Sequence, residues 1–354
     1  MNDSAARLFG HLPDGRAVHE HTLDNGRGLV LRAINLGGIV TALRCLDRDG
    51  RAANIVLGFD ELADYIERNP NFGTLVGRYG NRIAAGRFVL DGQAHQLALN
   101  DGANALHGGP SGFGKRWWVI ERLPAHADGS VALELTLTID DGDQHYPGRL
   151  DATVRYTLTP ANEWRIDYRA TTTRPTIVNL THHGYYNLAG GGSALDQELT
   201  LNASRFLPVD ATLIPGAIAE VEGTPFDFRR PTPIVARIRS GAPQLMLARG
   251  YDHCWLIDGG GRGELVPAAR LADPVSGRVM EIATTEPGIQ FYSGNFLDGT
   301  VTGKSGAIYR QGDALCLEPQ VFPDTPNKPA FGSARLDPGN TYRNVIVYRF
   351  SVRK

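Results

Sequence analysis

Polar side chains that could carry acid/base chemistry interrupt this chain inside otherwise apolar segments. The run Leu315-Cys-Leu-Glu318-Pro-Gln places a single carboxylate in a stretch apolar enough to be a buried strand. A buried glutamate is uncommon without a partner, and taken alone Glu318 fits a structural ion pair. A second segment carries the adjacent histidines His182 and His183. On a strand their side chains point to opposite faces, so the pair is not expected to bind one metal ion together.

Other segments supply hydrogen-bonding groups. Asn81 and Arg82 lie among glycines and offer amide and guanidinium donors suited to sugar hydroxyls, although a capped turn with a surface arginine explains the pattern equally well. His107 lies in a glycine-rich loop, Asp252 follows Gly-Tyr, and Gln290 follows Pro-Gly-Ile. The chain carries no thiolate set, phosphate loop, dinucleotide motif or nucleophile elbow. These groups together predict acid/base chemistry on a polyhydroxylated ligand, with no cofactor and no metal.

The elements that must position these groups read as strands. Apolar and polar residues alternate over 131–139, 152–158, 164–170 and 344–352, and short turns join the first three runs into an antiparallel meander. Helical periodicity is scarce and is expected only around 61–67. The pattern predicts an all-β fold, a large antiparallel β-sandwich with few short helices. No linker, repeat or composition shift divides the chain, so one domain is expected over residues 1–354.

Composition restricts the partners. Among 354 residues, Lys+Arg 36 against Asp+Glu 38 gives a formal charge of −2, which gives no reason to expect nucleic acid or an acidic membrane. The three cysteines, Cys45, Cys254 and Cys316, lie in apolar runs and are expected to be buried rather than reactive. The sequence has no signal-peptide pattern and no apolar stretch of about 18 residues. We therefore expect a cytoplasmic monomer or homodimer that acts on a small molecule.

Six ordered motifs carry a family resemblance that begins at residue 54 and reaches the final strand. They are Gly77-Arg-x-x-Asn-Arg-Ile83, Leu106-His-Gly-Gly109, Asn179-Leu-Thr-x-His183-x-Tyr185-x-Asn-Leu188, Gly250-x-Asp-His253, Pro287-Gly-x-Gln290 and Glu318-x-Gln-x-Phe-Pro-Asp324-x-x-Asn327. In these motifs the sequence resembles the aldose 1-epimerases (galactose mutarotases). The resemblance implies a galactose-mutarotase-like supersandwich and interconversion of the α and β anomers of free aldoses such as glucose and galactose. It also implies that His183 is the general acid and Glu318 the general base. The implied sugar contacts are Asn81, Arg82, His107, Tyr185, Asp252 and Gln290.

The chain departs from the family pattern beside the catalytic positions. His182 stands where members often carry Asn, Gly184 where they carry Ser or Thr, and Pro319 where Thr is more usual. The implied chemistry needs a base that is ionised at pH 7, which suits Glu318, and an imidazole kept partly protonated by a nearby carboxylate. Asp252 is a candidate for that carboxylate, although it could equally bind sugar hydroxyls.

Three alternative functions remain open from the sequence. A hexose-6-phosphate 1-epimerase would need extra cations in the pocket, and Arg78, Arg82 and Arg87 are available. A non-catalytic sugar-binding protein could use the same scaffold, but mere binding needs no acid/base pair. A glycosidase would pair two carboxylates across the bond that it cleaves.

Overall fold

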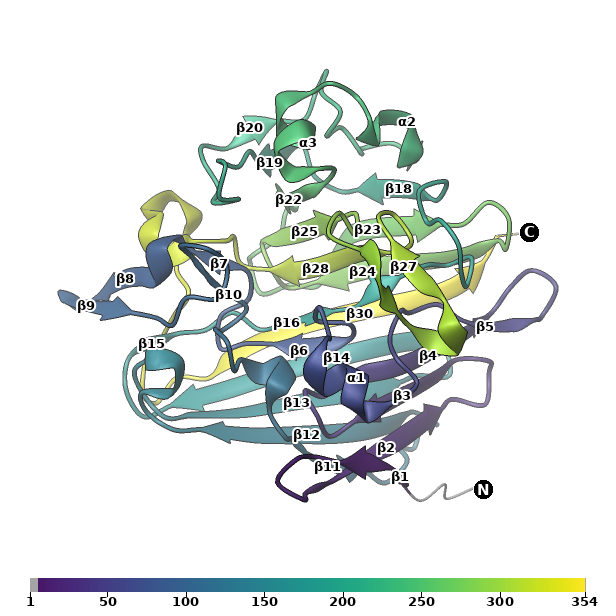
Figure 1. The fold of residues 1–354 in the computed structure, drawn as a ribbon, viewed down its shortest axis with the longest axis horizontal. Helices are drawn as coiled ribbons and strands as arrows, with labels where there is room; N and C mark the ends of the chain where they lie inside the picture. Colours follow the sequence, from purple (N-terminus) through teal and green to yellow (C-terminus); the bar gives the residue numbers. More distant parts are fainter. Residues whose placement is uncertain (1–5, 354) are drawn as a thin grey trace.

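Antiparallel strands dominate the computed structural model, which describes residues 6–353 (Figure 1). The largest sheet has nine strands in the order β11-β12-β13-β14-β30-β24-β23-β18-β21. Their bounds are Val119–Arg122, Val131–Ile139, Leu150–Leu158, Glu163–Thr172, Tyr342–Val352, Arg278–Thr284, Val266–Ala272, Glu198–Leu201 and Thr232–Pro233. All four alternating runs are strands of this sheet, and β12, β13 and β14 form the expected meander.

A second sheet of six strands, in the order β17-β28-β25-β22-β19-β20, packs against the first. Its strands are Tyr185–Tyr186, Leu315–Gln320, Gly288–Tyr292, Asp252–Leu256, Arg205–Leu207 and Ala219–Glu220. Side chains of both sheets fill one hydrophobic cluster, to which Trp164 and Tyr348 contribute from one side and Trp255, Phe291 and Leu317 from the other. The expected all-β class is therefore confirmed.

The amino-terminal segment forms a separate five-stranded meander, β1 to β5, drawn in purple in Figure 1. Its strands are Arg7–His11, Ala17–Asp24, Val30–Ile34, Val40–Leu46 and Ala52–Asn54. The remaining strands form short pairs: β6 (Thr74–Val76) with β16 (Thr181–His183), β7 (Arg82–Ile83) with β10 (Ala105–Leu106), β8 (Arg87–Leu90) with β9 (Gln93–Gln96), β15 (Thr176–Ile177) with β29 (Arg335–Leu336), and β26 (Asp298–Thr302) with β27 (Ile308–Arg310).

Helices are few and short. They are α1 (Leu62–Glu67), which lies where the sequence predicts a helical turn, α2 (Val235–Ile238) and α3 (Pro243–Ala248). Over residues 6–353, no helix has the length and apolar character needed to cross a membrane. Cys45, Cys254 and Cys316 are buried and unpaired, as the sequence predicts.

Candidate active site

The six-stranded sheet presents a polar face because its strands alternate strictly. In β28, Leu315 and Leu317 point into the hydrophobic cluster, so Glu318 lies on the opposite face. The strand register sets Gln290 of β25 directly opposite Glu318. Asp252 of β22 lies diagonally beyond, close enough for its Oδ1 to accept a hydrogen bond of 2.7 Å from Gln290 Nε2. Strand pairing therefore brings together three polar side chains that are far apart in the sequence.

Strand β16 separates the two histidines. His182 is fully buried in the core, where its ring packs edge-to-face on Trp164 with centroids 4.9 Å apart. His183 points the other way and stacks on Tyr185 with centroids 5.1 Å apart. The expected division of the pair between opposite faces is therefore confirmed. The glycine that follows also has a structural reason, since a Cβ at Gly184 would lie 2.5 Å from the ring of Tyr186.

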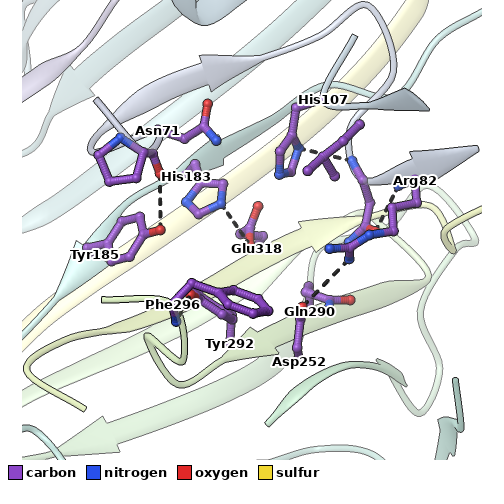
Figure 2. Close-up of a pocket in the computed structure, with 13 residues that line it drawn as sticks. Asn71, Arg82, His107, His183, Tyr185, Asp252, Gln290, Tyr292, Phe296 and Glu318 are labelled. Carbon is purple, nitrogen blue, oxygen red and sulfur yellow. Dashed lines mark hydrogen bonds and ion pairs between the residues drawn. The ribbon is translucent and has the colours of Figure 1, made fainter. Parts of the chain in front are cut away.

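His183 and Glu318 meet at the floor of a cavity of about 180 Å³ (Figure 2). His183 Nε2 lies 3.8 Å from Glu318 Oε1, and the two side chains are only 7% and 3% exposed. Within residues 6–353, Glu318 Oε2 has no hydrogen-bond partner. The cavity is lined by Pro70, Asn71, Asn81, Arg82, Leu106, His107, His183, Tyr185, Asp252, Gln290, Tyr292, Phe296 and Glu318. The structure thus gathers all eight of the sequence-predicted site residues around one cavity.

Burial reverses the usual order of the two pKa values in the dyad. Desolvation raises the pKa of Glu318 well above 4.5, and the neighbouring Asp252 adds to the rise. Desolvation also lowers the pKa of His183 to about 4. This differs from the expectation of an ionised glutamate beside a protonated imidazole. The reason is that a site closed to water penalises both charges, so the empty dyad favours a protonated, neutral Glu318 beside a neutral His183.

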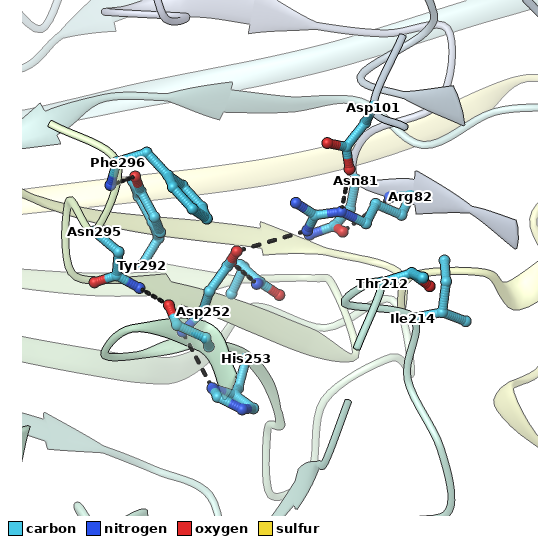
Figure 3. A network of polar contacts seen from close by, with 12 residues as sticks. Asn81, Arg82, Asp101, Thr212, Ile214, Asp252, His253, Tyr292, Asn295 and Phe296 are labelled. Atoms are coloured by element: carbon cyan, nitrogen blue, oxygen red, sulfur yellow. Dashed lines mark hydrogen bonds and ion pairs between the residues drawn. The ribbon is translucent and has the colours of Figure 1, made fainter. Parts of the chain in front are cut away.

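Arg82 is flanked by two carboxylates (Figure 3). Its Nε donates to Asp101 Oδ2 at 2.7 Å, and its Nη1 lies 3.6 Å from Asp252 Oδ2. Burial lowers the pKa of Arg82, but Asp252 and Asp101 more than offset this, so the net shift is upward. Asp252 is thus engaged by Arg82 and Gln290, and the carboxylate paired with His183 is Glu318 rather than Asp252.

His107 carries a defined tautomer. Its Nδ1 accepts a hydrogen bond of 3.2 Å from the backbone N–H of Asn81, so Nε2 holds the proton of the neutral ring. Burial lowers the pKa of His107 well below 6.5, which keeps the ring neutral. His107, His183 and Glu318 have ligand atoms within 4.8 Å of one another. A protonated Nε2 is a donor rather than a metal ligand, so this trio suits a sugar hydroxyl better than a metal ion.

The loop that carries His107 depends on one close backbone approach. Gly108 has φ +85°, and a Cβ there would lie 2.0 Å from the carbonyl oxygen of Gly77. The glycines of the two motifs therefore let the loops at 77–82 and 106–109 pack directly on each other.

Several residues around the cavity escaped the sequence analysis. Asp101, Tyr292 and Phe296 all lie outside the six motifs. Tyr292 and Phe296 are also aromatic residues, a type that is more often buried in a core. Phe296 is 52% exposed and stacks on Tyr292, an exposure that sequence alone does not reveal. Two other arginines are placed elsewhere: Arg78 is buried and donates to the carbonyl oxygens of residues 147 and 148, and Arg87 is exposed on β8.

Comparison with known proteins agrees with this geometry. A family model described as aldose 1-epimerase matches residues 19–349. The chain is 44% identical to a galactose mutarotase of Bos taurus over 98% of both chains. It is 37% identical to an aldose 1-epimerase of Escherichia coli (strain K12) over 96% of both. Among solved structures, a galactose 1-epimerase from Lactobacillus acidophilus superposes with a TM-score of 0.87 at 29% identity, covering 99% of each chain.

Proposed function

This chain belongs to the aldose 1-epimerase family, and on that premise we propose that it interconverts the α and β anomers of free aldohexoses such as glucose and galactose. The observation that carries the proposal is the buried pair of His183 and Glu318, whose reactive atoms lie 3.8 Å apart at the floor of the cavity. Ring opening of a pyranose requires an acid and a base within reach of two neighbouring oxygens. A paired imidazole and carboxylate supply both.

The reaction proceeds by two proton transfers at each ring opening. The sugar reacts with the ionised form of the dyad, in which the single proton is on His183 and Glu318 is a carboxylate. Glu318 takes the proton of the anomeric hydroxyl while His183 protonates the ring oxygen, and the bond between C1 and the ring oxygen breaks to leave an aldehyde. Rotation about C1–C2 exposes the other face of the carbonyl. The ring oxygen then attacks C1 as His183 takes back its proton and Glu318 returns one to the carbonyl oxygen. Atoms and charges balance without a cofactor, because the dyad carries one proton throughout.

The shifted pKa values suit this exchange. A carboxylate with a raised pKa is a stronger base than free glutamate, and an imidazole with a pKa of about 4 is a stronger acid than free histidine. Transfer of the proton from His183 to Glu318 through the substrate, which opens the ring, therefore runs in the direction that burial favours.

The remaining lining residues support binding of a neutral sugar. Gln290 Oε1 has no partner among the described residues and can accept from a hydroxyl, and the neutral His107 can donate through Nε2. We assign Asn81, Arg82 and Asp252 to further hydroxyl contacts and Tyr185 to the wall of the cavity. The cavity offers few cations to bind the phosphate of a hexose 6-phosphate. Arg82 is the one lysine or arginine among the lining residues, and it already faces Asp252.

Polarimetry tests the proposal directly. Freshly dissolved α-D-glucose and α-D-galactose are followed to equilibrium with and without the protein. We expect the protein to accelerate the change in rotation and to leave the end point unaltered. A non-catalytic sugar-binding protein would leave the rate at its spontaneous value, and that result would contradict the proposal.

A further inference from the structure

Asp101 occupies an unusual place beside the cavity. It does not line the cavity itself, yet its Oδ2 accepts from Arg82 Nε at 2.7 Å, on the side of the guanidinium away from Asp252. Figure 3 shows the guanidinium lying between the two carboxylates. The side chain of Asp101 is 35% exposed, whereas that of Asp252 is 8% exposed. Arg82 therefore meets one carboxylate in the protein interior and another that faces water.

The turn that carries Asp101 is fixed before any ligand arrives. The backbone N–H of Asp101 donates to Asn104 O at 3.1 Å, and the N–H of Asn104 returns a bond of 2.9 Å to Asp101 O. The side chain of the buried Asn104 accepts from Ala85 N at 3.0 Å and donates to Thr212 O at 3.2 Å. Two separate segments thus anchor the turn, so the Asp101 carboxylate is preorganised on Arg82.

The charges around Arg82 affect which sugars the site can bind. One guanidinium shared by two ionised carboxylates leaves a local charge of −1 beside the cavity. A guanidinium free of such partners would be a good phosphate ligand, because its planar fork matches phosphate oxygens. In this chain two of the three guanidinium nitrogens already face a carboxylate: Nε donates to Asp101, and Nη1 lies 3.6 Å from Asp252.

We propose that Asp101 is a positioning residue that makes the site select neutral sugars: it fixes the Arg82 guanidinium and cancels the charge that an anionic sugar would need. The inference rests on the proposed function, since it concerns which aldoses that site accepts. Arg82 held in this way presents N–H donors to hydroxyl oxygens, while a phosphate dianion meets net negative charge. A sugar carboxylate, as in a uronic acid, is disfavoured for the same reason.

The test compares glucose with glucose 6-phosphate in wild-type protein and three variants. Asp101→Asn keeps an oxygen acceptor for Arg82 and removes the charge, whereas Asp101→Glu keeps the charge. Asp167→Asn is the matched control, because Asp167 also pairs with an arginine at 2.7 Å and is 33% exposed, but on β14 of the nine-stranded sheet. If Asp101→Asn does not fold, Asp101→Ser removes the same charge and takes its place.

We expect Asp101→Asn to raise kcat/KM for glucose 6-phosphate about tenfold at low salt. This is the effect expected when one negative charge is removed a short distance from the phosphate, in a medium between water and protein interior. High salt should erase that gain. For glucose, KM should rise a few-fold with little change in kcat, because Arg82 is less firmly held. Asp101→Glu should keep the wild-type preference for glucose over glucose 6-phosphate, and Asp167→Asn should behave as wild type.

Two failures are distinguishable. If wild-type protein does not accelerate mutarotation of free sugars, the proposed function is wrong and this inference falls with it. If wild-type protein is active but Asp101→Asn and Asp167→Asn show the same ratio of kcat/KM for the two sugars, only the role of Asp101 is overturned. An equal change in Asp101→Glu and Asp101→Asn would also overturn it, because loop disruption and not charge would then be the cause.

Discussion

Replacing Glu318 by glutamine tests the dyad most directly. The side chain is 3% exposed, its Oε1 lies 3.8 Å from His183 Nε2, and its Oε2 has no partner among residues 6–353. Glutamine has nearly the same volume but cannot take a proton at neutral pH. General base catalysis contributes about 10²–10⁴-fold, so we expect the enzymatic rate to fall by that factor, which corresponds to about 2.7–5.4 kcal/mol on the barrier. Polarimetry on α-D-glucose measures it.

The same substitution should not destabilise the fold. Burial raises the folded-state pKa of Glu318 above its unfolded value, so the unfolded chain releases its proton first as pH rises. The carboxyl group therefore contributes full stability below the unfolded pKa and loses it as pH rises through the folded pKa. Glutamine carries no such proton. We expect urea unfolding to show Glu318→Gln at least as stable as wild type at pH 8, with the advantage shrinking toward pH 4.

Glu286 provides a matched control. It is 5% exposed, accepts from the hydroxyl of Tyr342 at 3.1 Å and does not line the cavity. Burial raises the pKa of Glu286 to about 7, so Glu286→Gln should gain up to about 3 kcal/mol of stability above pH 7 while keeping its rate. Wild-type rates in Glu318→Gln, or an equal loss of rate in Glu286→Gln, would refute the assignment of Glu318 as the base.

Three further predictions concern the same site. His183→Asn should lose about 10²–10⁴-fold in rate. His182→Asn should stay active but lose about 1–3 kcal/mol of unfolding free energy, since it leaves a smaller polar group packed on Trp164. If the two variants behaved the other way round, the motif would be misaligned by one residue. The active dyad holds one proton, and because burial lowers the pKa of His183 to about 4, a second proton is added only in that pH range. The pH profile of kcat/KM should therefore stay level well below pH 6.5, and an acid limb centred at 6.5 would contradict the shift. Free glucose or galactose should react faster than glucose 6-phosphate at equal concentration, with little effect of salt; a preference for the phosphorylated sugar that disappears in high salt would assign the protein to phosphosugar chemistry.

The sequence by itself determined the elements and the types of the reacting groups. Period-two alternation is local, because neighbouring side chains on a strand must point to opposite faces. It therefore located β12, β13, β14 and β30 and placed His182 and His183 on different faces. The motifs carried every residue proposed as acid, base or sugar contact, and all of them line one cavity.

Only the tertiary structure decided how those groups act on one another. Whether Glu318 pairs with His183 depends on how β16 packs beside β28. Whether Asp252 serves the imidazole or Arg82 depends on the register of β22, β25 and β28, and pairing between distant segments leaves no local trace in the sequence. The pKa shifts follow from burial, which is a property of the assembled sheets. Asp101 could not be singled out from its loop sequence, because its partner Arg82 reaches it only after the two loops pack together.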